Sequence, residues 1–437
     1  MQNSQRPNQP AGKPPSGKAP MTPFTQYQIL VIAILAFLQF TIILDFMILS
    51  PLGAMLMDTL HITTAQFGFV VSAYAFSAGA SGILAAGFAD KFDRKKLLLF
   101  FYAGFLVGTL FCGLAPNYHM LLMARIVTGV FGGVIGSISF AIIADLFPFE
   151  MRGRVMGFVQ TAFAAAQVMG LPLGLLLSNK FGWHAPFLMI VGASSAVGIL
   201  IMAKLQPVTG HLKLKSDRNP LQHLLKTVSR PRYLAAFSAT TLLATGGFML
   251  MPFGSAFSVH NLGIPLDKLP MVYLITGVSS IVAGPLIGKL SDAIGKYTLF
   301  VLGSILMIGM VLYYCNLGIT PLWLVIVINI VLFIGITARM ISSQALSSAV
   351  PDPQDRGAFM SINASTAQIS GGIAASIAGL IVVQTPSGAL GRYGVLAWVV
   401  SGAILVTIGL MYNINRIVKA KQAQAVPAPA QQVSTAT

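Results

Sequence analysis

Twelve long apolar stretches constrain the fold of this 437-residue chain more than any other feature of its sequence. Each contains about 20 mostly apolar residues, the length that a helix needs to cross a membrane. They cover residues 27–51, 67–88, 97–115, 120–144, 155–178, 185–204, 233–258, 271–290, 298–317, 322–346, 358–383 and 393–415. Hydrophobic residues make up 55% of the chain and charged residues only 9%, which excludes a water-soluble protein. We therefore expect an all-α membrane protein with twelve transmembrane helices.

The basic residues indicate which side of the membrane each connection faces. The net charge of +16 is by itself also typical of nucleic-acid-binding proteins. However, 22 of the 27 Lys and Arg residues lie in the two tails and the even-numbered loops, whereas the opposite side has only Lys180, Lys268 and Arg392. By the positive-inside rule both termini are cytoplasmic, and the charge indicates topology, with no nucleic acid as partner.

The longest internal connection divides the spans into two sets of six. It is basic and polar, and the segments outside the first and last spans are rich in polar residues and Pro. The expected organisation is a disordered cytoplasmic tail (1–26), an N-terminal six-helix bundle (27–204), a cytoplasmic linker loop (205–232), a C-terminal six-helix bundle (233–415) and a second disordered cytoplasmic tail (416–437).

The two sets of six spans also share sequence features. Residues 86–95 after the second span match 288–297 after the eighth, and Arg152-Gly153 after the fourth span matches Arg356-Gly357 after the tenth. A nearly constant spacing in two separate loops indicates a duplicated six-helix unit, as in transporters with parallel repeats. The loop AGFADKFDRKK resembles the signature loop of the major facilitator superfamily, Gly-x-x-x-Asp-Arg/Lys-x-Gly-Arg-Lys, and the resemblance covers about residues 27–415.

The signature loop departs from the family pattern at two glycine positions, where this chain has Ala86 and Asp93. Asp is acceptable at the second position because it enters left-handed turns more readily than most residues. The resemblance implies that charged residues at the cytoplasmic side latch the two halves together. The alternative is that they only supply positive-inside charge. The predicted latch residues are Asp90, Lys91, Arg94, Asp145, Glu150, Arg152, Arg154, Asp292 and Lys296.

One acidic side chain, Asp45, lies well inside a span. In span four, Arg125 is followed by Gly129, and this element resembles the Arg-x-x-x-Gly motif of the drug:proton antiporter branch. Both charges lie roughly 8–9 Å below the outer ends of their spans, so they form a plausible pair. We predict that Asp45 takes up and releases a proton with the assistance of Arg125. The alternative is a purely structural ion pair between spans one and four.

A second intramembrane arginine, Arg339, lies nearer the cytoplasmic end of the bundle than Asp45 and out of its direct reach. One hypothesis is that it attracts an anionic group of a substrate. The other is that it bonds to backbone carbonyls or extends toward the inner interface. A substrate cavity of methionine, aromatic and few polar side chains suits amphiphilic compounds, although the same residues also pack against neighbouring helices. The predicted cavity residues are Gln39, Phe46, Met249, Phe253, Asn329 and Arg339.

Span five contains a motif of small residues and proline, Gly170, Pro172 and Gly174, which is similar to the antiporter motif of efflux transporters. Small residues allow helices to approach closely, and proline bends a helix. The two cysteines, Cys112 and Cys315, lie in apolar spans without a metal-binding partner. Neither a nucleotide-binding loop nor a zinc or catalytic pattern occurs, so we expect no cofactor, no metal and no enzymatic activity.

Taken together, these features predict a secondary transporter that exports a small amphiphilic or drug-like molecule in exchange for protons by alternating access. A proton symporter or a facilitator for a sugar or organic anion is the alternative within transport. A non-transporting receptor or scaffold is the alternative outside it. We expect a monomer in the lipid bilayer of the inner (cytoplasmic) membrane.

Overall fold

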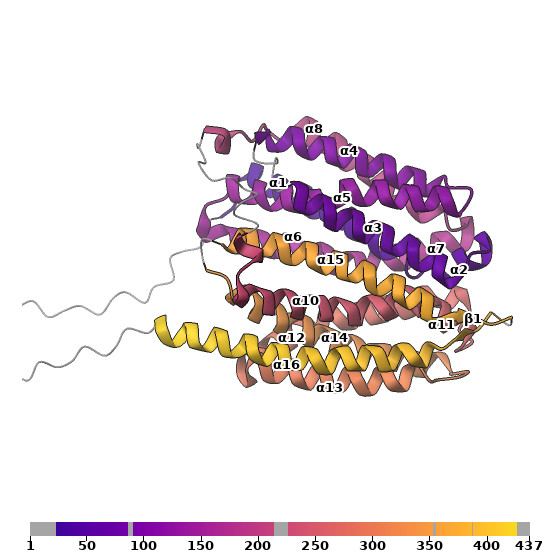
Figure 1. The fold of residues 1–437 in the computed structure, drawn as a ribbon. Coiled ribbons are helices and arrows are strands. Elements are labelled where there is room, and N and C mark those ends of the chain that lie inside the picture. Colours follow the sequence, from indigo (N-terminus) through magenta and orange to yellow (C-terminus); the bar gives the residue numbers. More distant parts are fainter. Residues whose placement is uncertain (1–22, 86–90, 214–225, 353–354, 387, 426–437) are drawn as a thin grey trace, which may run out of the picture.

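The chain folds into a bundle of long helices that lie side by side (Figure 1). The computed structural model describes residues 23–85, 91–213, 226–352, 355–386 and 388–425. Within these residues, twelve helical segments are long and apolar enough to cross a membrane, which confirms the predicted all-α fold.

The first six spans begin and end close to the predicted boundaries. They are α1 (Gln26–Ile48), α3 (Thr64–Ala85), α4 (Arg94–Gly113), α5 (Tyr118–Leu146), a fifth span and α8 (Ala185–Lys204). The fifth span consists of α6 (Phe149–Ala165), a π-helical turn (Ala166–Gly170) and α7 (Leu171–Phe181). The short helix α2 (Gly53–Leu60), which the apolar pattern did not indicate, follows α1.

The second six spans follow the connection that contains a 3₁₀ turn, Gly210–Lys213. The seventh consists of α10 (Pro231–Leu250), a 3₁₀ turn (Met251–Phe253) and α11 (Gly254–His260), and the eighth of a 3₁₀ turn (Leu266–Lys268) and α12 (Leu269–Ile294). The others are α13 (Lys296–Tyr314), α14 (Leu322–Ala349), α15 (Arg356–Ile381) and α16 (Tyr393–Ala425). A two-stranded antiparallel hairpin, β1 (Val383–Gln384) and β2 (Leu390–Gly391), joins α15 to α16.

Residues 416–425, which we predicted to belong to a disordered tail, continue α16 as a helix. The ammonium group of Lys421 donates hydrogen bonds to the carbonyl oxygens of Ala349, Val350 and Pro351, at 3.4, 3.3 and 2.7 Å. These carbonyls lie at the C-terminal end of α14, where backbone acceptors lack helical partners and a cation is favoured. The prediction for residues 416–425 was therefore wrong because a tertiary contact holds this segment.

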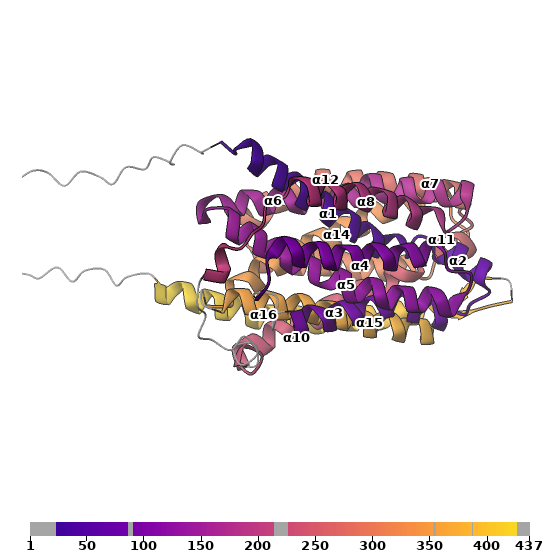
Figure 2. The same cartoon turned by 90° about the horizontal axis from the view of Figure 1, so that it is seen from above.

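The start of α1 and the end of α16 lie at the same end of the bundle (Figures 1 and 2). We call it the basic end because Arg94, Arg152 and Lys421 also lie there, and we call the other the outer end. The two halves meet along two helix pairs. Helix α3 packs along α15, and α12 packs against α7 and the preceding π-helical turn.

The apolar cores differ between the two ends of the bundle. Toward the outer end, one continuous core contains residues of both halves, among them Phe67 and Phe253. Toward the basic end, each half has a core of its own, around Leu98 in the first half and Phe359 in the second. The halves are therefore packed together more extensively at the outer end.

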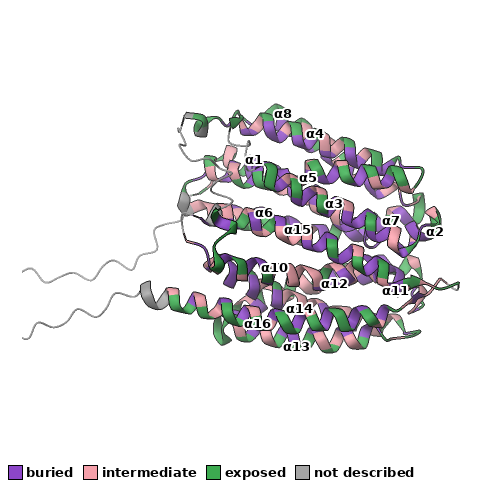
Figure 3. Cartoon of the chain, in the orientation of Figure 1, coloured by how far each residue is buried: buried purple, intermediate pink, exposed green. Residues whose placement is uncertain are grey.

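Exposed residues occur along all the long helices (green in Figure 3). Many of them are large and apolar, among them Phe100, Leu286 and Trp398. Such a surface is unfavourable in water, but it matches the hydrocarbon of a lipid bilayer. The distribution of exposed apolar residues agrees with a chain that crosses the membrane many times.

Candidate functional site

Asp45 and Arg125 form an ion pair in the interior of the first half. The Nη1 atom of Arg125 donates a 2.8 Å hydrogen bond to Oδ2 of Asp45, and both side chains are at most 1% exposed. The same nitrogen lies 3.3 Å from the carbonyl oxygen of Asp45, and the Thr109 hydroxyl donates a 3.2 Å hydrogen bond to Oδ1. Both carboxylate oxygens thus have a partner, as a buried charge requires. The predicted proton-coupling role stays a prediction.

The glycines that follow Arg125 determine how closely α5 approaches α3. A side chain at Gly129 would overlap the Tyr74 backbone, and one at Gly133 would overlap the Ala78 backbone. This close approach places the Tyr74 ring 4.5 Å from the Arg125 guanidinium carbon, which gives the cation an aromatic face in addition to the carboxylate. The sequence motif therefore supplies both the charge and the contact surface that holds it.

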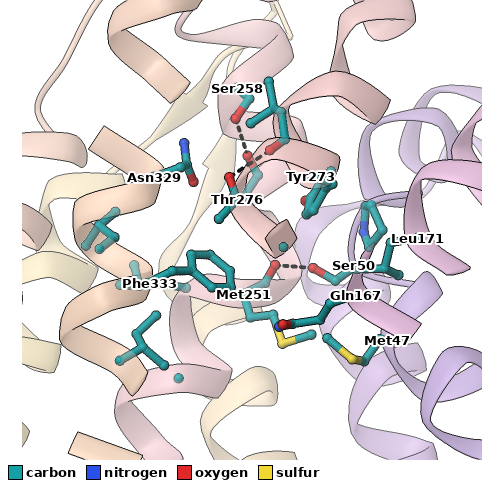
Figure 4. A pocket seen from close by; sticks show the side chains of 18 of the residues that line it. Met47, Ser50, Gln167, Leu171, Met251, Ser258, Tyr273, Thr276, Asn329 and Phe333 are labelled. Carbon is teal, nitrogen blue, oxygen red and sulfur yellow. Dashed lines mark hydrogen bonds between the residues drawn. The ribbon is translucent and has the colours of Figure 1, made fainter. Parts of the chain in front are cut away.

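A cavity of about 270 Å³ lies between the two halves (Figure 4). Most of its lining is apolar and includes Met47 of α1, Leu171 of α7 and Phe333 of α14. Polar side chains line it as well, and these are Ser50, Gln167, Ser258, Tyr273, Thr276, Tyr314, Asn329 and Tyr393. Among the described residues, no Asp, Glu, Lys, Arg or His lines it.

Of the six residues predicted to line a substrate cavity, Asn329 lines this one. The side chains of Met249 and Phe253 are at most 1% exposed and belong to the core shared by the two halves. The Phe46 ring packs between those of Tyr74 and Phe248.

Gln39 is buried on α1, and Arg339 lies behind the cavity wall. The predicted cavity residues come from spans one, seven and ten, and further spans contribute to this cavity. Span four gives no lining residue, whereas spans five and eight give several, among them Gln167 and Tyr273.

The motif of span five lies against α1. A side chain at Gly170 would meet Leu44, and one at Gly174 would meet Ile48. Pro172 lies in the first turn of α7, directly after the π-helical turn that contains Gln167. Wide turns of this kind often occur at functional sites. Here the turn is in the segment that lines the cavity and contacts α12.

In the first half, four of the predicted latch residues make contacts at the basic end. Arg94, which is buried, pairs with Asp145 at 3.2 Å. Arg152 donates hydrogen bonds of 2.9 and 2.6 Å to the carbonyl oxygens of Phe147 and Ala144 at the end of α5. The guanidinium of Arg154 lies 3.6 Å from the centre of the Phe24 ring. These contacts connect segments of the same half.

The remaining first-half latch predictions are less informative. The side chain of Lys91 is exposed. Asp90 and the side chain of Glu150 lie outside the described residues.

Asp93 does not adopt the left-handed geometry that we considered for it, since its φ is −55° and its ψ is 124°. Its carboxylate instead accepts hydrogen bonds from the backbone N–H groups of Lys95 at 2.9 Å and Val208 at 3.0 Å. It is the N-cap of α4, a position at which Asp is strongly preferred. The departure from glycine therefore has a local physical reason.

The second half has a charge cluster that the sequence analysis missed. Asp352 pairs with Arg232 at 2.6 Å and with Lys421 at 3.3 Å, and Asp355 pairs with Arg230 at 2.7 Å. Burial raises the pKa of Asp352, but hydrogen bonds from Arg232 and Lys421 outweigh this and bring it below its ordinary value. The acidic residues directly before the repeated Arg356-Gly357 were the available signal.

Asp292 and Lys296, the latch residues that we predicted in the second half, are exposed. Neither forms an ion pair with another described residue.

Polar contacts join the halves toward the outer end. The Ser50 hydroxyl donates a hydrogen bond to the carbonyl oxygen of Met251, and the Ser255 hydroxyl donates a 2.8 Å bond to the carbonyl oxygen of Ser50. Nearby, His260 of α11 lies 3.6 Å from the carboxylate of Asp58 in α2. Together with the shared core, these contacts show a conformation in which the outer end is closed.

A bundle of twelve spans with a cavity between two six-helix halves is an arrangement found in secondary transporters. The model of the Major Facilitator Superfamily matches residues 35–375 and 236–428. The chain belongs to the major facilitator superfamily. This is a family of transporters, not of enzymes, so the chain is a multi-pass membrane transporter.

Two relatives from Bacillus subtilis (strain 168) carry the description "Uncharacterized MFS-type transporter". YceJ is 30% identical over 273 residues, which are 62% of this chain and 68% of YceJ. YtbD is 27% identical over 239 residues, which are 54% of this chain and 58% of YtbD.

Solved structures show the same fold at low identity. One is a bacterial homologue of the human lysosomal transporter Spinster in an inward-facing and unoccupied conformation. It has a TM-score of 0.69 and 15% identity, and the match covers 93% of this chain and 100% of that one. A mutant of the nucleoside transporter NupG has a TM-score of 0.68 and 15% identity, with 89% of this chain and 99% of that one covered.

Proposed function

We propose that this transporter exports a small amphiphilic molecule across the inner membrane in exchange for protons, and that Asp45 is its proton-binding group. The observation that carries the proposal is the buried ion pair of Asp45 and Arg125. Ionisable groups inside transmembrane spans are costly and commonly mark ion and proton pathways. Asp45 is the buried carboxylate that the described spans place at this depth.

The contacts of Asp45 define two states of the pair. Ionised, the carboxylate accepts hydrogen bonds from Arg125 and Thr109. When it takes up a proton it becomes neutral, its attraction to Arg125 weakens, and one oxygen becomes a donor. Arg125 keeps its charge, which the Tyr74 ring and the carbonyl oxygen of Asp45 continue to stabilise. Protonation thus changes the force between α1 and α5.

Helix α1 connects this change to the cavity and to the outer closure. Met47, two residues after Asp45, lines the cavity. Ser50, which follows the helix, bonds to the second half through Met251 and Ser255. At a rise of 1.5 Å per residue, Asp45 lies about 8 Å along the helix axis from Ser50. A small shift of α1 on protonation therefore acts on both the cavity wall and the contact between the halves.

The cavity suits an amphiphilic molecule because apolar side chains form most of its surface and hydroxyl and amide groups interrupt it. A ligand gains from the removal of its apolar body from water, while a few hydrogen bonds orient it. Figure 4 shows such groups, Ser258, Tyr273, Thr276 and Asn329, near one another at one side of the cavity.

The test begins with a search for transported compounds. Purified protein is screened for thermal stabilisation by dyes, antibiotics, sugars and lipids at two pH values, since a ligand of the folded state raises its stability. A stabilising compound is then loaded into proteoliposomes and its flux is measured under an imposed pH gradient. We expect proton and substrate to move in opposite directions.

The decisive variant is D45N, with D267N as the matched control. Asp267 is an exposed carboxylate outside the bundle interior, where its side chain pairs with Lys268. We expect D45N to abolish pH-driven flux while counterflow without a gradient persists, and D267N to behave as the wild type. Undiminished pH-driven flux in D45N would show that the proton binds elsewhere. Movement of both species in the same direction would instead establish a symporter.

A further inference from the structure

The guanidinium of Arg339 is buried in the second half, and no carboxylate of the described residues pairs with it. Its residue is only 4% exposed, and its Nη1 atom contacts the sulfur of Met307 at 2.9 Å. The Phe300 ring centre lies 5.5 Å from the guanidinium carbon. Within the described part of the chain, Nε and Nη2 have no hydrogen-bond partner. A thioether is a weak acceptor, so this cation has lost its water without receiving strong acceptors in return.

The charges in the interior do not balance. Five charged side chains are buried among the described residues, and two of them, Arg94 and Asp355, lie at the basic end. Of the three within the spans, Asp45 and Arg125 neutralise each other. Arg339 therefore leaves one net positive charge inside the bundle. Such a charge is costly, and it persists in proteins when a partner or a function compensates for it.

Neither hypothesis of a merely structural arginine fits these contacts. An arginine that bonds to backbone carbonyls would use its donors on them, but two of its nitrogens have no acceptor in the described residues. An arginine that extends toward the interface would expose its guanidinium to water, whereas this one is almost fully buried.

The cation lies directly behind the cavity wall. Met307, its contact, lines the cavity, and so does Gly246. A Cβ atom at Gly246 would lie 3.9 Å from Nη1, so the guanidinium lies next to a residue of the cavity wall. Ile336, one turn before Arg339 on α14, also lines the cavity. Methionine is flexible, and a change in its rotamer would open the wall at this position.

Arg339 and the polar side of the cavity lie at different depths. Asn329 precedes Arg339 by ten residues on α14, which separates them by about 15 Å along the helix. The cavity thus has hydroxyl and amide groups toward the outer end. The cation lies behind the cavity wall, nearer the basic end.

We propose that Arg339 is the anion-binding group of this cavity and that the substrates are small amphiphilic organic monoanions, such as aromatic carboxylates. The carboxylate accepts hydrogen bonds from Nε and Nη2, which a planar guanidinium offers side by side. The apolar body fills the space beside Met307 and Phe333. One negative charge on the ligand balances the one positive charge of the interior. This inference rests on the proposed function in one respect, that the cavity between the halves is the transport cavity.

The test uses three probes that share a naphthalene ring and differ in charge: 2-naphthoate, its methyl ester, and 2-naphthylmethylammonium. Dissociation constants are measured by equilibrium dialysis of detergent-purified protein near pH 8, where the carboxylate is ionised, against protein-free micelles as the blank. We expect the wild type to bind naphthoate at least about 10-fold more tightly than the ester, as a hydrogen bond to a charged group provides. The ammonium probe should bind more weakly than the ester.

The variants R339M and R339K separate charge from shape. We expect R339M to bind naphthoate about 10- to 100-fold more weakly while its affinity for the ester is unchanged. R339K should keep much of the preference for the anion, because the charge remains although the planar fork is lost. Equal binding of naphthoate and ester by the wild type, or unchanged naphthoate affinity in R339M, would overturn the proposal. If R339M does not fold, the three probes on the wild type still decide it.

The result is separable from that of the proton site. Equilibrium binding requires no proton gradient, so D45N should retain the preference for naphthoate over its ester. If D45N loses pH-driven flux but the wild type shows no preference for the anion, only the Arg339 proposal is wrong. If the wild type prefers the anion but D45N keeps undiminished pH-driven flux, only the proton-site proposal is wrong.

Discussion

The ion pair of Asp45 and Arg125 allows a quantitative prediction, because both side chains are buried and their contact is short. Three variants are needed: D45N, R125M and the double variant. In each single variant one partner is removed and the other remains in an interior from which water is excluded. Breaking a buried pair in this way costs about 3–5 kcal/mol of unfolding free energy.

The structure places the two single variants within this range. In D45N the amide can still bond to Arg125 and Thr109, but the guanidinium charge is left without its counter-charge at 2.8 Å. It keeps the carbonyl of Asp45 at 3.3 Å and the Tyr74 ring, so we expect the lower end, about 3 kcal/mol. R125M leaves the carboxylate with the Thr109 hydroxyl alone, and it should cost as much or more.

The double variant contains no buried charge at this place. Replacing a buried pair by uncharged groups is often close to neutral, so it should be no less stable than either single variant. The coupling energy, the difference between the double variant and the sum of the single ones, should thus be at least about 3 kcal/mol.

The assay is reversible unfolding by sodium dodecyl sulfate in mixed micelles, followed by far-ultraviolet circular dichroism. The exposed pair of Asp267 and Lys268, 3.4 Å apart, is the control, and its coupling should be indistinguishable from zero. Additive effects of D45N and R125M would refute the reasoning, because they would mean that the buried contact contributes no interaction energy.

Two further predictions concern stability at other places in the fold. In the folded protein the pKa of Asp352 lies below its ordinary value of 3.8. Its ionised carboxylate therefore stabilises the folded state above pH 3.8, and this stabilisation is lost as the pH falls through the lower pKa of the folded state. D352N should therefore be slightly less stable than the wild type at pH 7 in thermal unfolding. The difference in stability between D352N and the wild type should shrink below about pH 4. A difference that does not change with pH would contradict this prediction. Gly133→Ala should destabilise the protein by about 1–3 kcal/mol, since its Cβ would overlap the Ala78 backbone. Gly136→Ala on the same helix meets nothing within 4 Å and should be neutral or stabilising; equal losses in both would argue against close packing of α3 and α5.

The sequence indicated the contact of Asp45 with Arg125 because a rare residue type carried the information. It gave no such indication where the orientation of a helix decides which side chains line the cavity. Asp45 and Arg125 stand out because charges inside apolar spans are rare, and their matched depth follows from the helical rise alone. Met249 and Phe253 were expected in the cavity but belong to the core between the halves. A transmembrane helix is apolar toward lipid, toward its neighbours and toward a cavity, so its sequence has no periodicity that distinguishes these faces.

Contacts between distant loops were likewise beyond the sequence. The charge cluster of Asp352, Arg232 and Lys421 joins the ends of α14, α10 and α16, which are far apart along the chain. The capping role of Asp93 depends partly on Val208, more than a hundred residues away. Such pairings depend on which helix ends lie side by side.

The sequence by itself determined that this chain is a twelve-span membrane protein with two related halves and a basic side. It could do so because a bilayer admits long apolar helices and few other structures, and because charge governs their orientation. Only the tertiary structure decided which side chains form the cavity, which end of the bundle is closed, and that Arg339 lies beside the cavity wall without a carboxylate partner among the described residues. These are properties of the spacing and rotation of helices, which arise from packing between surfaces of the same chemical character.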